Sequence, residues 1–346
     1  MTDEICLVGF GAIGALYACA LERSSRAKIT SVCRSNYQTM HEHGLMIVSD
    51  CIGTIDAWRP HRVVRSVAEA ADRQYSFIVC ATKCVPEVKK TTDIILPLLA
   101  TLSSSSDTTI VLLQNGIGIE DDILDWLDEH NLGNTVISGC AWVDTTMIDG
   151  GKKVTQHGNE KLVLGYHRPQ ASHTKYATRF SKNTAIKQLD VFCDLLRAGS
   201  TNPEAAEDID IARWRKVLWN ASFSTVCTLT RANVGEVLAT PTARTLLVEI
   251  MLEVLLVARA SLPPSPAVTD VLSDSVCIAI IEHENQKSVF KPSMLVDLEA
   301  GRPMEVEAIV GGVLKRAKAT GVAVPRLEVI YAGLNVIQRG LLGDRQ

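Results

Sequence analysis

The stretch that decides the fold is Ile5-Cys6-Leu7-Val8-Gly9-Phe10-Gly11-Ala12-Ile13-Gly14, near the start of the chain. Its first four residues are apolar and predict a buried strand, and the alanine-rich run that follows predicts a helix. The glycines between them have the spacing G-x-G-x-x-G, which allows a tight turn, a close approach of the backbone to a pyrophosphate, and close packing of helix on strand. Strand, turn and helix together predict a dinucleotide site at the helix N-terminus, where unpaired N–H groups attract negative charge. We assign to this site Gly9, Phe10, Gly11, Ala12, Ile13 and Gly14.

The rest of the first half repeats the alternation of strand and helix. Apolar runs predict buried parallel strands at Ile5–Val8, Ile29–Cys33, Phe77–Ala81, Ile110–Leu113 and Val136–Cys140. Helices are predicted at Ala12–Arg23 and Val85–Leu99. A further strand pair is expected at Lys152–His157 and Lys161–Tyr166, then a surface loop over Arg168–Asn183, and a last α/β unit to about residue 205. Such alternation predicts a doubly wound parallel sheet.

The second half is helical from Ile209 onward. Thr240-Pro241 is a helix start signal, and that helix is expected to stop before Leu262-Pro263-Pro264. Another helix is predicted from about Met304 to Thr320. The predicted fold class is therefore α/β, with an N-terminal Rossmann-type doubly wound parallel sheet followed by an all-α C-terminal domain. We expect a dinucleotide-binding domain in residues 1–207 and a helical domain for the substrate and catalysis in residues 208–346.

Composition and charge exclude several classes of protein. The formal net charge is -4 and no cluster of Lys and Arg is visible, so no nucleic-acid partner is expected. The most hydrophobic helix candidate, Leu246–Ala258, carries two glutamates and is too short to span a membrane. The ten cysteines are scattered without a C-x-x-C pair, which indicates reduced structural thiols, and no His/Cys/Asp cluster suggests a metal site. The acidic start Met1-Thr2-Asp3-Glu4 does not resemble a signal peptide, so we expect a cytoplasmic protein.

The end of the second predicted strand indicates which dinucleotide is bound. An NAD site usually has an Asp or Glu about 20 residues after the glycine turn, to bind the ribose 2′-hydroxyl. Here the strand ends in Cys33-Arg34-Ser35-Asn36, without a carboxylate. Arg34 suits a 2′-phosphate, which favours NADPH and NADP+ as the cofactor pair. The alternative for Arg34 is a solvated surface charge.

Polar side chains follow two other predicted strands. Thr82-Lys83 comes after the Phe77–Ala81 strand, and Gln114-Asn115-Gly116 comes after the Ile110–Leu113 strand. Ligands of open α/β sheets bind at the carboxyl ends of strands. Lys83 could neutralise a phosphate or bind the ribose, and Asn115 could bind ribose or nicotinamide. Strand ends are also often polar for solvation alone.

Three features of the helical half have ordinary local explanations when each is taken singly. Lys216 and Asn220 are four residues apart and therefore share one helix face, but Lys216 could be an ordinary exposed lysine of an amphipathic helix. Ser293, in Lys291-Pro292-Ser293-Met294, could cap a helix. Glu305 could be a first-turn carboxylate that the helix dipole favours.

Taken together and in order, these residues resemble the ketopantoate reductase (2-dehydropantoate 2-reductase) family, from about Ile5 to Tyr331. The matching motifs are the glycine turn at 9–14, Thr82-Lys83, Gln114-Asn115-Gly116, Trp214-Arg215-Lys216-x-x-x-Asn220, Lys291-Pro292-Ser293-Met294-x-x-Asp297, Glu305, Gly321 and Pro325. The resemblance implies NADPH-dependent reduction of a small 2-oxo acid to the 2-hydroxy acid, either ketopantoate to pantoate, a step of pantothenate biosynthesis, or a close analogue. It leaves the oligomeric state open, a homodimer included.

The resemblance also implies roles for single residues. Lys216 resembles the general acid that protonates the substrate carbonyl oxygen, and Asn220 the residue that orients the substrate and this lysine. Ser293 resembles the ligand of the substrate carboxylate. Glu305 resembles the glutamate near the nicotinamide and the catalytic lysine, and Lys83 and Asn115 resemble cofactor ligands. A proton donor of this kind suits hydride transfer, because negative charge then develops on the carbonyl oxygen.

Two substrate-side positions depart from the family pattern. Ser224 stands where the family commonly has an asparagine, and Val234 precedes Gly235-Glu236 where another asparagine is usual, with Asn233 one residue earlier. We keep Ser224 and Asn233 as candidate substrate ligands, but the branched, hydroxylated end of ketopantoate is less well matched than its 2-oxo acid end. Two other functions stay open: a β-hydroxyacid or opine-type dehydrogenase, and a non-catalytic NADPH-binding sensor or scaffold.

Overall fold

The structure, a computed structural model, describes residues 2–343 and divides into two compact units. Unit 1 contains the chain up to Lys83, then Lys89–Gln114 and Ile119–Ile209. Unit 2 contains Cys84–Val88, Asn115–Gly118 and the chain from Asp210 onward. Two short segments that leave strands of the unit 1 sheet are therefore part of unit 2. The functions assigned to the two halves of the chain stay predictions.

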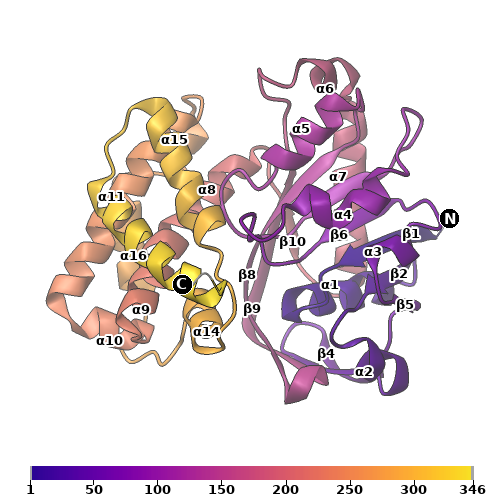
Figure 1. Ribbon diagram of the computed structural model, residues 1–346, viewed down its shortest axis with the longest axis horizontal. Coiled ribbons are helices and arrows are strands. Elements are labelled where there is room, and N and C mark those ends of the chain that lie inside the picture. The colour runs from indigo at the N-terminus through magenta and orange to yellow at the C-terminus, as the bar shows by residue number, and fades with distance from the viewer. Residues whose placement is uncertain (1, 344–346) are drawn as a thin grey trace. The chain divides into compact units, whose positions relative to one another are not determined.

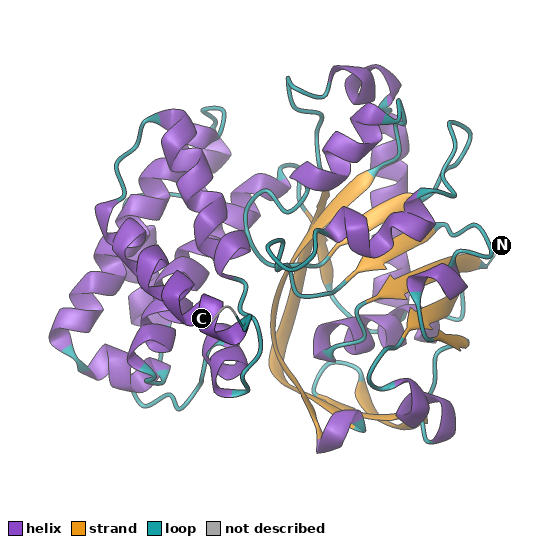
Figure 2. Cartoon of the chain, viewed as in Figure 1, coloured by secondary structure: helices purple, strands orange, loops and turns teal. Residues whose placement is uncertain are grey.

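A single sheet, ten-stranded within residues 2–343, is the centre of unit 1 (Figures 1 and 2). Its strands are β1 (Asp3–Val8), β2 (Ala27–Val32), β3 (Leu45–Ser49), β4 (Gly53–Trp58), β5 (Arg62–Val64), β6 (Phe77–Cys80), β7 (Thr109–Leu112), β8 (Val136–Ile148), β9 (Lys153–Tyr166) and β10 (Pro203–Ala205). Their order is β4-β3-β9-β8-β7-β6-β1-β2-β5, and β10 pairs with β9. The pairs β8–β9 and β3–β4 are antiparallel, and the others are parallel.

The strand order reverses at β1. From β1 the chain builds outward through β2 and β5 on one side, and through β6, β7 and β8 on the other. The topological switch point, where open α/β sheets bind ligands, therefore lies between the carboxyl ends of β1 and β6. Both faces of this part of the sheet are covered, since every residue of β6 and β7 is buried. That burial is the reason why these strands are continuous apolar runs in the sequence.

Helices cover both faces of the sheet, as right-handed connections on either side of a switch point require. They are α1 (Ala12–Arg23), α2 (Tyr37–Glu42), α3 (Val67–Ala70), α4 (Thr91–Leu99), α5 (Asp121–Glu129), α6 (Thr174–Arg179) and α7 (Lys182–Ala198), with a 3₁₀ turn η1 (Asp149–Gly151) between β8 and β9. Helices α1 and α7 pack against each other, whereas α3, α4, α5 and α6 form a second row in which each contacts the next (Figure 1).

The regular secondary structure of unit 2, within its described residues, is all helical (Figure 2). Its elements are α8 (Ile209–Trp219), η2 (Asn220–Ser224), α9 (Thr225–Thr230), α10 (Val234–Ala239), α11 (Pro241–Ser261), α12 (Pro266–Val271), α13 (Val276–His283), α14 (Ser293–Glu299), η3 (Glu307–Gly311), α15 (Gly312–Thr320) and α16 (Pro325–Leu341). The long helix α11 is central, since α10, α13, α15, α16 and η2 all pack on it. Both η2 and η3 are π-helical turns, and they contact each other. None of the helices in residues 2–343 combines the length and the apolar composition that a membrane span requires.

The predicted fold class is confirmed, but several predicted boundaries are wrong. The helix expected over Val85–Leu99 begins only at Thr91, because residues 84–88 are held in unit 2 by the contacts described below. The strand pair expected over residues 152–166 is the single strand β9, which pairs with an extended β8 on both sides of an irregularity between Trp142 and Asp144. The expected loop over residues 168–183 contains α6 and the start of α7.

A pair of glycine substitutions tests the packing of α1 on the sheet. A Cβ at Gly14 would lie 2.1 Å from the Gly9 carbonyl oxygen, whereas a Cβ at Gly11 would meet no atom within 4 Å. We expect Gly14→Ala to lower the free energy of unfolding by about 1–3 kcal/mol through overpacking. Gly11→Ala should change it by less than about 1 kcal/mol. Urea unfolding without cofactor measures both, and equal midpoints for the two variants would contradict this packing.

Candidate functional site

Two turns approach each other at the switch point of unit 1. Gly9, in the turn after β1, has φ +106°, a conformation that favours glycine. A Cβ at Gly9 would lie 2.4 Å from the backbone nitrogen of Thr82, in the turn after β6. Any other residue at position 9 would therefore push the ends of β1 and β6 apart. The first glycine of the motif is required by this close approach as well as by the turn.

The N-terminus of α1 has the features of an anion site. Gly11 is its N-cap residue, no side chain caps the helix, and its first turn contains no acidic residue. The first N–H groups of a helix have no partner within the helix, and the helix dipole adds positive charge there. The space that a Cβ at Gly11 would enter is open. These residues fit a pyrophosphate, which the backbone from Gly11 to Gly14 would hold.

Phe10, which was also assigned to the cofactor, anchors the turn. Its ring is buried and stacks on Trp58 with 6.1 Å between the ring centroids. Its carbonyl oxygen accepts a hydrogen bond of 3.3 Å from the Asn36 side-chain amide. Phe10 therefore ties the glycine turn to β4 through its ring and to the segment after β2 through its carbonyl oxygen.

The edge of the sheet where β2 and β5 end carries two arginines, of which only Arg34 was predicted. Arg34 is exposed, and Arg65 follows β5, which is the parallel neighbour of β2. The Cys33 N–H donates to the Val64 carbonyl oxygen at 2.9 Å, so residues 34 and 65 lie at the same edge of the sheet. The Arg65 guanidinium lies over the Tyr37 ring, 4.5 Å from its centroid. Among residues 2–343, no carboxylate pairs with either guanidinium.

The polar residues after β6 and β7 have different surroundings. Gln114 is buried, and its Nε2 donates to both the carbonyl and the hydroxyl oxygen of Thr82, at 3.1 and 3.0 Å. Its Oε1 accepts from the Thr91 hydroxyl at 3.2 Å. This amide locks the ends of β6 and β7 to the start of α4. Lys83 is exposed beside Thr82 and stays a candidate cofactor ligand.

Glu305 is the centre of a buried polar group within unit 2. Its side chain is only 4% exposed. The backbone N–H of Cys84 donates to its Oε1 at 2.9 Å, and Asn115 Nδ2 donates to its Oε2 at 3.2 Å. The Lys216 ammonium, on α8, donates to Asn115 Oδ1 at 2.8 Å. The structure thus brings together three residues predicted from distant parts of the chain.

The amide of Asn115 has one orientation in this group. A lysine ammonium only donates hydrogen bonds and an ionised carboxylate only accepts them, so Oδ1 must face Lys216 and Nδ2 must face Glu305. Asn115 therefore connects the cation to the anion without direct contact between them. Such a group could present an ammonium as a proton donor, with the carboxylate separated from it by one amide.

The segment that carries Asn115 is fixed on η3. Gly116 has φ +112°, and a Cβ there would lie 2.4 Å from the Ala308 carbonyl oxygen. The Ile117 N–H donates to that same oxygen at 3.0 Å, and Arg213 donates to the Gly116 carbonyl oxygen at 3.2 Å. Asn115 is therefore anchored from η3 and from α8, the helix that carries Lys216.

Two predicted substrate ligands lie in the π-helical turn η2, directly after α8. Asn220 and Ser224 are 8% and 2% exposed. Within residues 2–343 the chain gives neither the Asn220 amide nor the Ser224 hydroxyl a hydrogen-bond partner. The hydroxyls of Ser222 and Thr225 instead bond to carbonyl oxygens four residues earlier, at 2.6 and 2.7 Å. π turns of this kind are frequent at functional sites.

The other two predicted substrate ligands have different environments. Ser293 is exposed at the first position of α14, which packs against η2, and it makes no capping bond. Asn233 forms a capping box with Glu236, in which its Oδ1 accepts from the Glu236 N–H at 2.9 Å. Asn233 therefore has a structural role at the start of α10, and if it contacts substrate, its Nδ2 would make the contact.

Six buried thiols of the chain are poor nucleophiles. Burial raises the pKa to about 12 for Cys6, Cys19, Cys33 and Cys227, and to about 11 for Cys193 and Cys277. Such thiols stay protonated at neutral pH. Among residues 2–343, no group of three or more His, Cys, Asp or Glu side chains is arranged to hold a metal ion.

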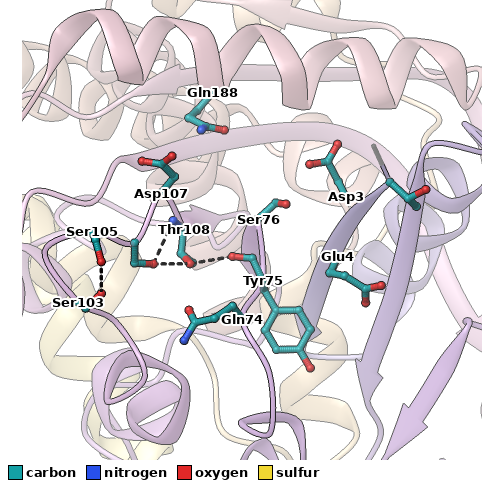
Figure 3. Close-up of a pocket in the computed structure, with 12 residues that line it drawn as sticks. Asp3, Glu4, Gln74, Tyr75, Ser76, Ser103, Ser105, Asp107, Thr108 and Gln188 are labelled. Carbon is teal, nitrogen blue, oxygen red and sulfur yellow. Dashed lines mark hydrogen bonds between the residues drawn. The ribbon is translucent and has the colours of Figure 1, made fainter.

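A cavity of about 580 Å³ in unit 1 lies away from the switch point. Its lining includes Asp3, Tyr75 and Asp107, which start or precede β1, β6 and β7 (Figure 3). Ser103 and Ser105 bond to each other, and the Thr108 hydroxyl donates to the Tyr75 carbonyl oxygen. These residues are at the amino ends of the strands, opposite the edge where nucleotides bind, so the cavity is not the predicted cofactor site.

Comparison with known proteins gives matches to both halves of the chain. A family model described as "Ketopantoate reductase PanE/ApbA" matches residues 5–169, and one described as "Ketopantoate reductase PanE/ApbA C terminal" matches residues 208–338. An uncharacterised Saccharomyces cerevisiae protein, YDL144C, is 31% identical over 351 residues, which cover 98% of this chain and 94% of that protein.

Solved structures agree with these matches. The 2-dehydropantoate 2-reductase of Methylococcus capsulatus is 29% identical, with a TM-score of 0.77 over 98% of this chain and 97% of that one. A D-mandelate dehydrogenase, solved as a ternary structure with NADH and anilino(oxo)acetate, is 21% identical, with a TM-score of 0.77 over 98% of this chain and 99% of that one. The second likeness concerns the fold.

The bridging role of Asn115 has a direct consequence for stability. In Asn115→Leu the buried Glu305 carboxylate loses one donor, so we expect the free energy of unfolding to fall by about 1–3 kcal/mol. Asn335→Leu is the control, because the half-buried Asn335 amide donates to a backbone carbonyl oxygen, that of Tyr331 one turn earlier, at 3.0 Å, and not to a buried carboxylate. That variant should lose less than about 1 kcal/mol. Equal losses in urea unfolding would contradict the bridge.

Proposed function

We propose, from the premise that this chain belongs to the ketopantoate reductase family, that it reduces a small 2-oxo acid to the 2-hydroxy acid with NADPH. The observation that carries the proposal is the group Lys216, Asn115 and Glu305, in which a lysine ammonium is held by an amide that a buried carboxylate orients. A reductase of ketones needs a proton donor of this kind, and a protein that only binds NADPH does not.

We assign proton transfer to Lys216, and binding or positioning to the other residues of the candidate site. When bound, a reduced nicotinamide supplies the hydride. Lys216 would donate the proton that turns the substrate carbonyl oxygen into a hydroxyl, since an ammonium stabilises the negative charge that develops on that oxygen. Asn115 and Glu305 would hold the ammonium in position. Asn220, Ser224 and Ser293 are the proposed ligands of the substrate.

The choice of NADPH rests on the edge of the sheet beside β2. Arg34 and Arg65 place two guanidinium groups there without a paired carboxylate, which suits a 2′-phosphate. Residues Gly9–Gly14 would hold the pyrophosphate, and Lys83 the ribose or a phosphate. A carboxylate that would favour the 2′-hydroxyl of NADH does not follow β2.

The substrate is proposed as ketopantoate or a close 2-oxo acid. Ser224 has a shorter side chain than the asparagine common in the family at this position, and Val234 offers no side-chain hydrogen bond. The side chains proposed to bind the substrate carbonyl and carboxylate are present. At the far end of ketopantoate, however, the chain offers fewer hydrogen-bonding groups than the family pattern. Aromatic 2-oxo acids belong in a substrate panel, because a D-mandelate dehydrogenase shares the fold.

Turnover with 2-oxo acids tests the reaction. Wild type should oxidise NADPH with at least one acid of a panel that includes ketopantoate, and Lys216→Ala should lower kcat by about 10²-fold or more. Lys318→Ala, an exposed lysine of the same unit, should leave kcat unchanged. Tight NADPH binding without oxidation by any acid would contradict the enzyme proposal and favour a sensor.

Cofactor preference tests the two arginines. We expect Arg34→Ala and Arg65→Ala each to raise the KM for NADPH by about 10-fold or more, with little change for NADH, because a charge-assisted hydrogen bond to the 2′-phosphate is lost. Arg73→Ala is the control, since Arg73 is paired with Asp72 at 3.1 Å. A wild-type enzyme that uses NADH as well as NADPH would overturn this part of the proposal.

A further inference from the structure

Gln338, on α16, is a buried amide whose side chain makes three hydrogen bonds to two other segments of unit 2. It is 2% exposed. Its Oε1 accepts from the Met304 N–H at 2.9 Å, and its Nε2 donates to the Met304 carbonyl oxygen at 2.8 Å. The second hydrogen of Nε2 goes to Glu87 Oε1 at 2.7 Å. No feature of the sequence distinguished this residue.

Both segments lead to Glu305. Met304 is the residue directly before it, so the pair of bonds to the Met304 backbone fixes where the Glu305 side chain begins. Glu87 lies three residues after Cys84, whose N–H donates to Glu305 Oε1 at 2.9 Å. One side chain thus holds the backbone that carries the carboxylate and the segment that supplies one of its donors.

We propose that Gln338 is a positioning residue that sets the place of the Glu305 carboxylate, and through Asn115 that of the Lys216 ammonium. This inference rests on the function proposed above. Its physical basis is that a reacting group displaced by about 1 Å can cost about 10²-fold in rate even when the change lies far from the chemistry. Gln338 is connected to Lys216 through the Met304–Glu305 backbone and Asn115, so its effect on the reaction would be indirect.

If Gln338 had only a structural role, its removal should affect stability and activity no differently from removal of another buried amide. Unit 1 contains a matched amide for this comparison. Gln156 on β9 is fully buried. Its Oε1 accepts from the Ser49 hydroxyl at 2.6 Å and from the Cys51 N–H at 3.2 Å, and its Nε2 donates to the Gly158 carbonyl oxygen at 2.8 Å. Removal of either amide should lower the free energy of unfolding to a similar degree. Only removal of the Gln338 amide should displace the Glu305 carboxylate.

Cysteine amides provide a readout that does not depend on turnover. Selective ¹⁵N-cysteine labelling of the full chain gives ten backbone amides. The Cys84 amide donates to Glu305 and the Cys51 amide donates to Gln156, so each reports on one of the two sites. Single Cys→Ala variants assign the two signals. Gln338→Met and Gln156→Met keep similar side-chain volume and remove the amide.

The proposal expects a clear division between the two variants. In Gln338→Met the Cys84 amide signal should shift and exchange with solvent faster, while the Cys51 signal stays in place. Its kcat should fall by about 10-fold or more with KM within about three-fold, and the pH profile of kcat should move. Gln156→Met should shift the Cys51 signal and leave the Cys84 signal, kcat and the pH profile unchanged.

An exchange of partners supplies the rescue. Gln338→Glu places a second carboxylate against Glu87 and should lower kcat at least as much as Gln338→Met. Adding Glu87→Gln restores a donor and an acceptor between the two positions, so the double variant should recover part of the loss.

Three results would overturn the proposal: an unchanged Cys84 signal in Gln338→Met, equal losses of kcat in both methionine variants without a change in pH profile, or no recovery in the double variant. Wild type without turnover would instead overturn the proposed function. A shifted Cys84 signal would then still support the placement of Glu305 by Gln338.

Discussion

A carboxylate that is only 4% exposed must find its hydrogen-bond donors inside the protein, and the arrangement of the candidate site follows from how Glu305 finds them. One donor is the Cys84 N–H and the other is the Asn115 amide. Cys84 directly follows Lys83, and Asn115 directly follows Gln114, so the turns after β6 and β7 continue into the two segments that satisfy Glu305. The same turns carry polar groups assigned to the cofactor. The segments that donate hydrogen bonds to Glu305 are therefore continuous in the chain with the ends of β6 and β7. One of them, through Asn115, also bonds the proposed proton donor Lys216.

The helices of unit 2 are adapted to this group by irregular turns. Lys216 is followed by the π turn η2, and Glu305 directly precedes the helix that contains the π turn η3. A π turn displaces the regular pattern of backbone bonds, and hydroxyls such as that of Ser222 bond back to backbone carbonyls there. Asn220 and Ser224 are buried in η2, and among residues 2–343 their side chains have no hydrogen-bond partner.

Local patterns predicted the elements well and their long-range relations less well. The glycine turn and Arg34 were visible in sequence because each depends on a few neighbouring residues. Arg65 was not, since only the parallel pairing of β2 with β5 places it beside Arg34. The helix expected from Val85 was wrong because unit 2 holds residues 84–88, which no local periodicity reveals. Asn233 is the opposite case: its Asn-Val-Gly-Glu run was a readable capping-box signal, although the residue was assigned to substrate. The bridging role of Asn115 depends on partners about a hundred or more residues away.

The central claim is that the chain transfers a hydride to a 2-oxo acid, and isotope tracing measures that transfer directly. NADPH deuterated at C4, in each of its two stereochemical forms, would be incubated with the best acid of the panel, and the product analysed by mass spectrometry and NMR. The account predicts one deuterium at C2 of the hydroxy acid from one form and none from the other. Product without label from either form, or with label at C2 only when the solvent is D₂O, would contradict it.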